Sequence, residues 1–284
     1  MTATGLGTPR IADATAVRRG PDGTYDAILD PAYAIEGNTN GGLLLAILAR
    51  AAMQATGTTH PHSISASFLR PAPPGPARVH VDVLRSGQTA TYVRASLYRH
   101  DALAIDAGLV LGAPPDDERG AQAPFSLPPP DDCVPATTSG LQNLLERMAI
   151  RYAPGHSPTD PAAGTASDPA TVRAWLRPQD DEPVDAGLAL MCTDILAPAV
   201  HRLGYRGWAP TVHLTAQVHR PPAPGPLAAQ STAGDLRDGW FDQDTVVVDA
   251  SGVVVARARQ LARVPRGRTE NPQPQALDQR WGSR

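Results

Sequence analysis

The sequence predicts an α+β fold built from two tandem copies of one unit, each a helix lying on an antiparallel sheet. The block ISASFLRPAPPGP at residues 64–76 recurs as LTAQVHRPPAPGP at residues 214–226, which is 150 residues later and without a gap. In each copy an apolar, helix-like stretch precedes the block and alternating, strand-like runs follow it. One helix followed by a run of strands is typical of a helix packed on an antiparallel sheet.

The elements of the first copy follow in order. Residues 41–52 (GGLLLAILARAA) are almost wholly apolar and predict the helix. The prolines of RPAPPGP predict an irregular break, because proline cannot donate to a central strand ladder. Alternation of apolar and polar residues predicts the strands, which cover residues 64–68, 79–83, 91–97 and 103–109.

The second copy repeats this order. At the same offset, residues 191–202 (MCTDILAPAVHR) fall on the first helix and also predict a helix. Strands are predicted at residues 172–177, 212–218, 246–248 and 253–255. We therefore divide the chain into an N-terminal segment (1–24), a first unit (25–112), a Pro-rich linker (113–170), a second unit (171–265) and a flexible tail (266–284). Within the linker, residues 141–151 predict a short helix.

Composition excludes several classes of protein. A hydrophobic fraction of 42% in 284 residues supports a real core, and a net charge of −3 without a dense basic block argues against nucleic-acid binding. The longest apolar run, residues 43–48, is too short to cross a bilayer, and no signal-peptide core is evident. Cys133 and Cys192 form neither a disulfide framework nor a metal motif. We expect a cytoplasmic protein that contacts no membrane and has no metal or organic cofactor.

Two longer runs resemble a known family. NGGLLLAILARA (40–51) and PHSISASFLRPAPPGP (61–76) resemble the N-terminal hotdog domain of the acyl-CoA thioesterase II-like proteins. VDAGLALMCTDILAPAV (184–200), PTVHLTAQVHRPPAPGP (210–226) and DASGVVVARARQLARV (249–264) resemble their C-terminal hotdog domain. The resemblance implies a double hotdog, in which two units of one chain form a pseudo-dimer and an acyl thioester lies between them.

The resemblance also implies three catalytic residues. In the family an Asp, a Thr and a Gln hold the attacking water, and they match Asp194, Thr211 and Gln260. Each residue also has a purely structural interpretation: a capping or solvated Asp, a solvent-facing strand Thr, and a Gln bonded to backbone. At the 150-residue offset the three positions fall on Leu44, Pro61 and Val110, so the sequence predicts one working site.

The local pattern around two of these residues supports a role in a site. Asp194 falls at the edge of an apolar helix face, where partial burial would raise the carboxyl pKa and suit a general base. Gln260 is in phase with small and apolar residues, which predicts a buried amide that needs hydrogen bonds. Thr211 is less clear, because it is in phase with the polar residues His213, Thr215 and Gln217.

Asn40, Gly41 and Gly42 are candidate substrate-binding residues. Asn40 can cap the first helix, and the glycines let a ligand approach the backbone. Helix N-terminal N–H groups stabilise developing negative charge, so they could hold the thioester oxygen. The other interpretation is a tight turn that needs glycine for its conformation alone.

The predicted function is hydrolysis of an acyl-CoA or carrier-bound acyl thioester. A hotdog hydratase or dehydratase is an alternative, but it would resemble a scheme with a catalytic His before the central helix, and residues 36–40 and 183–187 contain none. A non-hydrolytic acyl-thioester binder is a second alternative, because fold does not determine function. Exposed sheet edges would favour association into a homo-oligomer.

Overall fold

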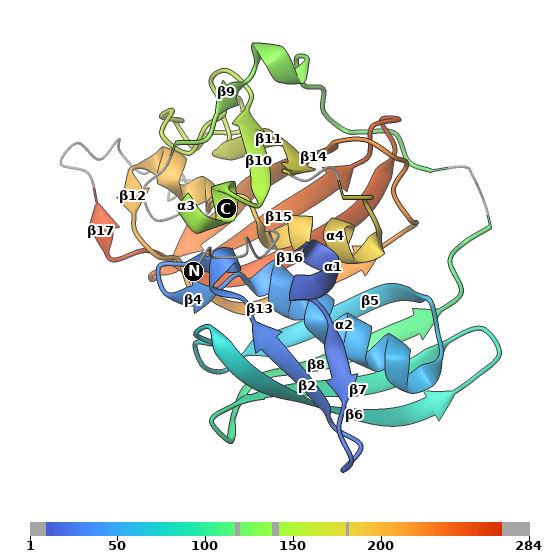
Figure 1. Ribbon diagram of the computed structural model, residues 1–284. Coiled ribbons are helices and arrows are strands. Elements are labelled where there is room, and N and C mark those ends of the chain that lie inside the picture. The colour runs from blue at the N-terminus through green and yellow to red at the C-terminus, as the bar shows by residue number, and fades with distance from the viewer. Residues whose placement is uncertain (1–9, 117–119, 138–141, 180–181, 269–284) are drawn as a thin grey trace, which may run out of the picture.

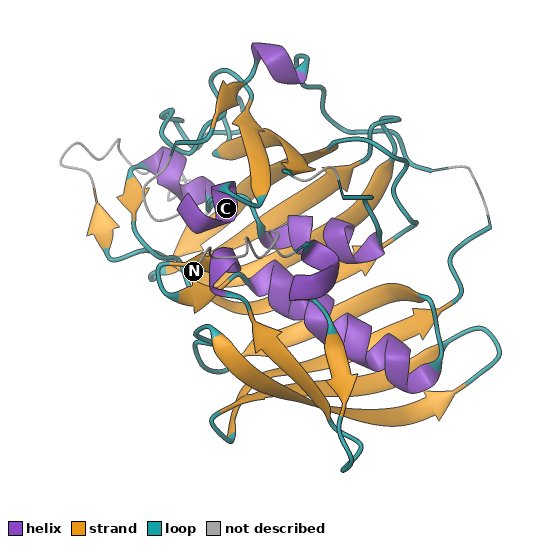
Figure 2. Cartoon of the chain, viewed as in Figure 1, coloured by secondary structure: helices purple, strands orange, loops and turns teal. Residues whose placement is uncertain are grey.

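A large antiparallel sheet carries two helices on one of its faces (Figures 1 and 2). The computed structural model describes residues 10–116, 120–137, 142–179 and 182–268. Within these residues, thirteen strands form the sheet in the order β1-β2-β6-β7-β8-β5-β13-β16-β15-β14-β11-β10-β9. The first six strands come from the first copy and its N-terminal segment. The other seven come from the second copy and the segment that precedes it.

The strand bounds follow the predicted alternation. In the first half they are β1 (Val17–Arg19), β2 (Tyr25–Leu29), β5 (His60–Phe68), β6 (Gly75–Ser86), β7 (Thr91–Arg99) and β8 (Ala102–Gly112). In the second half they are β9 (Val134–Pro135), β10 (Met148–Tyr152), β11 (Thr171–Pro178), β13 (Thr211–Val218), β14 (Leu227–Arg237), β15 (Trp240–Val248) and β16 (Val254–Arg263).

The two halves are related by a pseudo-two-fold axis between β5 and β13. Read outward from this pair, the order is β8, β7, β6, β2, β1 on one side and β16, β15, β14, β11, β10 on the other. Ser65 on β5 lies opposite Thr215 on β13, and these residues are 150 apart in the chain. The predicted pair of helix-on-sheet repeats forming a pseudo-dimer is therefore confirmed.

The two central helices differ in length. Helix α2 (Gly41–Thr56) begins after Asn40, whose Oδ1 accepts the Leu43 N–H at 3.0 Å. Helix α4 (Ala186–Met191) begins after Asp185, whose Oδ1 accepts the Leu188 N–H at 2.7 Å. Both helices are packed with leucines against the sheet and against each other, and these leucines form much of the core.

The second helix corrects one prediction. The α-helix ends at Met191 and so does not cover residues 191–202. The chain after it forms two 3₁₀ turns, η3 (Cys192–Asp194) and η4 (Ala199–Leu203). The two caps, Asn40 and Asp185, are 145 residues apart instead of 150. Counted from the caps, Asp194 corresponds to Ala49 of the first repeat and not to Leu44.

The segment at residues 113–170 is more than a linker. It contains β9, the short helices η2 (Pro130–Asp132) and α3 (Gln142–Leu145), and β10, which extends the second half of the sheet. The predicted helix over 141–151 is wrong at its C-terminal end, because Met148–Tyr152 alternate between buried and half-buried positions and pair with β11. Phe125 and Leu127 cover the outer face of the sheet.

One buried arginine holds part of this segment in place. Arg202 on η4 donates hydrogen bonds to the backbone carbonyls of Gly155, Asp160, Pro161 and Thr171. A buried guanidinium needs such acceptors, and here they come almost entirely from the chain that joins the two repeats. The segment therefore packs tightly against the second repeat.

Short elements complete the molecule at both ends of the chain. The N-terminal segment adds α1 (Ile11–Ala14) and β1, and η1 (Pro31–Tyr33) leads to the hairpin of β3 (Ala34–Ile35) and β4 (Asn38–Thr39). In the predicted flexible tail, β17 (Gly267–Arg268) pairs with β12 (Tyr205–Arg206), and residues 269–284 lie outside the described part.

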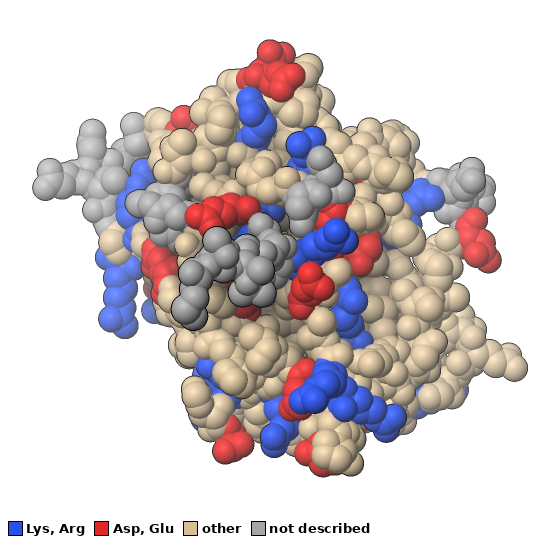
Figure 3. Space-filling view, in the orientation of Figure 1, with Lys and Arg blue, Asp and Glu red and all other residues tan. Residues whose placement is uncertain are grey.

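Two surface properties bear on the excluded classes. By length and composition Ala186–Leu203 could cross a membrane, but it consists of α4, η3 and η4 and is 61% buried inside the fold. On the face that Figure 3 shows, acidic and basic side chains are intermingled. Elsewhere, on the outer face of the sheet, Arg94 and Asp106 form an ion pair at 2.8 Å.

Candidate active site

A cavity of about 450 Å³ lies between the two repeats. The first repeat contributes the β3–β4 hairpin, the start of α2 and the residues that follow β5. The second repeat contributes η3, η4 and the chain from Arg206 to Val212. Pro158 and Thr159, which belong to the segment held by Arg202, form a further part of the wall. The cavity therefore requires both repeats and the chain that joins them.

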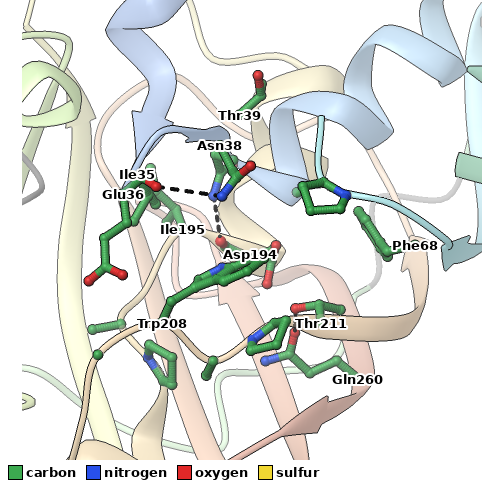
Figure 4. A pocket seen from close by; sticks show the side chains of 18 of the residues that line it. Ile35, Glu36, Asn38, Thr39, Phe68, Asp194, Ile195, Trp208, Thr211 and Gln260 are labelled. Atoms are coloured by element: carbon green, nitrogen blue, oxygen red, sulfur yellow. Dashed lines mark hydrogen bonds between the residues drawn. The ribbon is translucent and has the colours of Figure 1, made fainter. Parts of the chain in front are cut away.

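All three predicted catalytic residues line this cavity, as do Asn40 and Gly41. In Figure 4, Asp194 lies between the hairpin residues Ile35–Thr39 and the pair formed by Thr211 and Gln260. The turn η3, which carries Asp194, contacts β16, which carries Gln260. Gly42 lies just behind the wall.

Asp194 has an unusual protonation equilibrium. Burial raises the pKa of its carboxyl from the ordinary 3.8 to about 7, and a hydrogen bond from the Gly42 N–H offsets part of this rise. The side chain stays half-buried at the wall of the cavity. A carboxylate with a pKa near neutrality is a stronger base than a solvated one and remains largely ionised above pH 7.

The two glycines permit close approach of α2 to the turn that carries Asp194. A Cβ atom added at Gly41 would overlap Asp194 Oδ2, and one added at Gly42 would overlap the backbone carbonyl of Met191. Gly42 therefore requires glycine for contact between the repeats, because the atoms it meets are backbone, whereas a Cβ at Gly41 would displace the Asp194 side chain. The Gly42 N–H is bonded to Asp194, whereas Gly41 lines the cavity itself.

Asn40 makes two contacts with its side chain. Its Oδ1 caps α2, and its Nδ2 donates to the backbone carbonyl of Asp194 at 2.8 Å. The residue is 4% exposed. Its side chain thus joins the start of the first helix to the end of the second.

Thr211 faces the cavity because of a β-bulge. The strand phase predicted that it shares the polar face of His213, but the register between β13 and β16 shifts between these two residues. Thr211 lies opposite the buried Ala262, whereas His213 lies opposite the exposed Leu261. A bulge redirects the side chains on either side of it, so Thr211 turns to the inner face. Its Oγ1 donates to Gln260 Oε1 at 2.9 Å.

Gln260 is buried, as its phase on the strand predicted. It is 6% exposed and lies opposite Leu214 on β13. The same place in the first repeat, opposite Ile64, is occupied by Leu109 and not by Val110. The structural counterparts of the three site residues are therefore Ala49, Pro61 and Leu109, all without a polar side chain.

Gln243, a further buried polar residue that was not among the predicted site residues, lies opposite Gln260. Gln243 is 3% exposed, and its Oε1 accepts the N–H of Ala199 at 2.8 Å, which holds the start of η4 beside the site. Its phase with the buried Phe241 and Val247 is a signal that could have identified it. Phe68 and Trp208 also line the cavity, and no local pattern marked them.

The turn of the β3–β4 hairpin forms part of the cavity wall. Glu36 and Gly37 have φ angles of 48° and 82°, as a two-residue type I′ turn requires. Within the described residues, no group of three or more His, Cys, Asp or Glu side chains is arranged to hold a metal ion. Asn40 and Gln260 place amide groups, and Thr211 a hydroxyl, on the same cavity wall as Asp194.

Two family models and several known proteins match most of the chain. The family model of the acyl-CoA thioesterase N-terminal domain matches residues 29–112, and that of the C-terminal domain matches residues 129–264. A Mycobacterium tuberculosis protein described as uncharacterized is 31% identical over 271 residues, which is 85% of this chain and 91% of that protein.

Solved structures extend the similarity to the fold. The crystal structure of a candidate thioesterase II from Thermobifida fusca has a TM-score of 0.81 and 31% identity, and the match covers 92% of this chain and 99% of that one. A protein of unknown function with a hotdog fold from Alicyclobacillus acidocaldarius has a TM-score of 0.77 and 20% identity, with 89% and 97% covered.

Proposed function

The chain belongs to the acyl-CoA thioesterase family and has a double hotdog fold, and we propose that it hydrolyses acyl-CoA by water attack in the cavity between its repeats. Asp194 is the general base, and Thr211 and Gln260 hold the water. One observation carries this proposal: a carboxyl with a pKa of about 7 lines the same cavity as a bonded Thr–Gln pair.

The hydrogen bonds of the Thr–Gln pair determine how a water would be held. Because Thr211 Oγ1 donates its proton to Gln260 Oε1, Thr211 can only accept from a water. The Gln260 Nε2 group can donate to the water oxygen. A water that donates one proton to Asp194 and the other to Thr211 keeps a lone pair for attack on the thioester carbon.

The reaction then proceeds in two steps. Asp194 takes a proton as the water oxygen bonds to the carbonyl carbon, which gives a tetrahedral oxyanion. The C–S bond breaks, the thiolate leaves, and the proton on Asp194 returns to the sulfur. The N–H of Gly41 at the start of α2 is the proposed donor to the oxyanion, where the helix dipole adds to its effect.

We expect kcat to rise with pH through the pKa of Asp194. Below about pH 7 the carboxyl is protonated and cannot accept a proton, so log kcat should increase by one per pH unit and level off above pH 7. Thiol release measured from pH 5 to 9, corrected for uncatalysed hydrolysis, gives this profile. A profile that is flat from pH 5 to 9 would contradict a buried base.

A screen of thiol release over acyl-CoAs of increasing chain length tests the function itself. We expect release of free CoA with at least one of them. Addition of water to an enoyl-CoA without thiol release would instead favour a hydratase, and tight binding without turnover would favour a binding protein. Matched acyl-carrier thioesters, assayed in parallel, would distinguish the two carriers of the acyl group.

A further inference from the structure

The chain that follows the second central helix lacks one backbone hydrogen-bond donor. In a continuous α-helix the carbonyl of residue i accepts the N–H of residue i+4. The partner of the Asp194 carbonyl would be residue 198, which is proline and has no N–H. Helix α4 has already ended at Met191 and η3 ends at Asp194, so Pro198 does not end the helix; it cannot donate to the Asp194 carbonyl, which needs another partner.

Asn40 of the other repeat provides that partner. Its Nδ2 donates to the Asp194 carbonyl at 2.8 Å, while its Oδ1 accepts the Leu43 N–H at 3.0 Å. The side chain is 4% exposed, so water does not compete for these bonds. An amide can donate and accept at once, whereas an ionised carboxylate or a short hydroxyl at this place cannot make both contacts.

The corresponding cap in the other repeat makes a different contact across the repeats. Asp185 caps α4 with Oδ1 of its carboxyl, and its Oδ2 lies 3.9 Å from the guanidinium of Arg50 on α2. The carbonyl that corresponds to that of Asp194 belongs to Ala49, inside the continuous helix α2. Residue 53, which follows it by four, is methionine and has an N–H to donate. A cap side chain therefore bonds a backbone carbonyl of the other repeat at Asp194, whereas the cap Asp185 contacts the other repeat through an ion pair.

We propose that Asn40 is a positioning residue that holds the Asp194 turn against α2 and thereby sets the place and the solvation of the general base. Its side chain replaces the backbone donor that Pro198 removes. This inference rests on the proposed function for the role of Asp194, but the bridge itself can be measured without turnover.

The surroundings of Asp194 make its pKa a direct measure of this positioning. The charged and titratable groups on the cavity wall are Glu36, Arg70, His201 and Arg206. The raised pKa of Asp194 arises from burial, opposed only by the Gly42 amide. If the turn moves away from α2, water reaches the carboxyl and its pKa should fall toward 3.8.

Two variants test the bridge. Asn40→Ser keeps an N-cap oxygen, but its shorter side chain cannot reach the Asp194 carbonyl while it caps α2, so kcat should fall ~10-fold or more with little change in KM, and the Asp194 pKa should fall. Asn40→Asp keeps the cap and the volume; kcat should fall similarly, but the Asp194 pKa should rise because a second carboxylate lies nearby. Carboxyl ¹³C NMR titration, with Asp194→Asn to assign the signal, measures the pKa.

Asp185→Ser is the matched control, because it makes the same kind of change in the cap of the other repeat. It should leave kcat and the Asp194 pKa unchanged. The proposal is overturned if Asn40→Ser keeps the wild-type kcat and Asp194 pKa and differs only by a lower Tm, as expected of a simple cap. If the wild type releases no thiol from any thioester but the two pKa shifts appear, the proposed function fails and the positioning role stands.

Discussion

Replacing Asp194 by Asn should lower kcat for thioester hydrolysis by about 10³-fold while the protein stays folded. The amide has nearly the volume of the carboxyl but cannot take a proton from water. Thiol release at pH 8 measures the effect, and circular dichroism checks the fold. Asp235→Asn is the control, since the Asp235 side chain is 76% exposed and does not line the cavity. This variant should keep full activity.

The same substitution should make the protein more stable above neutral pH. The folded-state pKa of Asp194 is about 7 and the unfolded-state value is ordinary, so between these values the folded protein binds the proton more tightly. Raising the pH through this range therefore lowers stability, because a half-buried carboxylate must be ionised. At pH 8 the Asn variant escapes this cost, and its Tm should rise by ~3 °C.

At pH 4 the gain should largely disappear, because the carboxyl is then protonated in the folded protein. Thermal unfolding followed at both pH values is the measurement. The Tm difference between the Asn variant and wild type should therefore be larger at pH 8 than at pH 4. If the variant lost activity but this difference were the same at both pH values, the carboxyl would be hydrated in the folded protein. Asp194 would then be a weaker base than we propose.

Gly42→Ala should strongly destabilise the protein and reduce its activity. The added Cβ would overlap the backbone carbonyl of Met191, and a backbone atom cannot rotate away as a side chain can. Helices α2 and α4 would have to separate, which should cost ~2–3 kcal/mol of unfolding free energy, as overpacked cores do. The separation would also remove the Gly42 N–H from the Asp194 carboxylate.

Urea unfolding and thiol release test this variant together. Gly108→Ala is the matched control, because a Cβ there meets no atom within 4 Å, and its unfolding free energy should change by less than ~0.5 kcal/mol. An unchanged urea midpoint for Gly42→Ala would mean that the close contact between the repeats does not contribute to stability. It would also weaken the argument that glycine is needed for the site.

The strand phases predicted the burial of Gln260 correctly but not the orientation of Thr211. Gln260 is buried because it shares a face with Ala256, Ala258 and Ala262, and a period of two shows this in the letters themselves. Thr211 was placed on the polar face, because the bulge before His213 has no mark in the alternation. A bulge depends on the pairing of two strands, and one strand's sequence does not contain that information.

Composition was a weaker guide for the chain between the repeats. Its many prolines and small residues indicated a linker. In the structure Arg202 binds three backbone carbonyls of this segment and that of Thr171 beside it, and Thr159 forms part of the cavity wall. The arginine lies far along the chain from most of these partners. Only the folded chain brings them together.

The sequence by itself determined the duplication, the order of helix and strands in each copy, and the three polar residues that distinguish the second copy from the first. These properties follow from periodicity and from repetition, which are local or can be seen by sliding the chain along itself. The tertiary structure alone decided that Asn40 bonds the Asp194 carbonyl, that Gly41 and Gly42 touch the same turn, and that the carboxyl has a pKa of about 7. Each of these three properties depends on burial and on contacts between residues about 150 positions apart. The residues next to any one position in the sequence do not determine its burial or its long-range contacts.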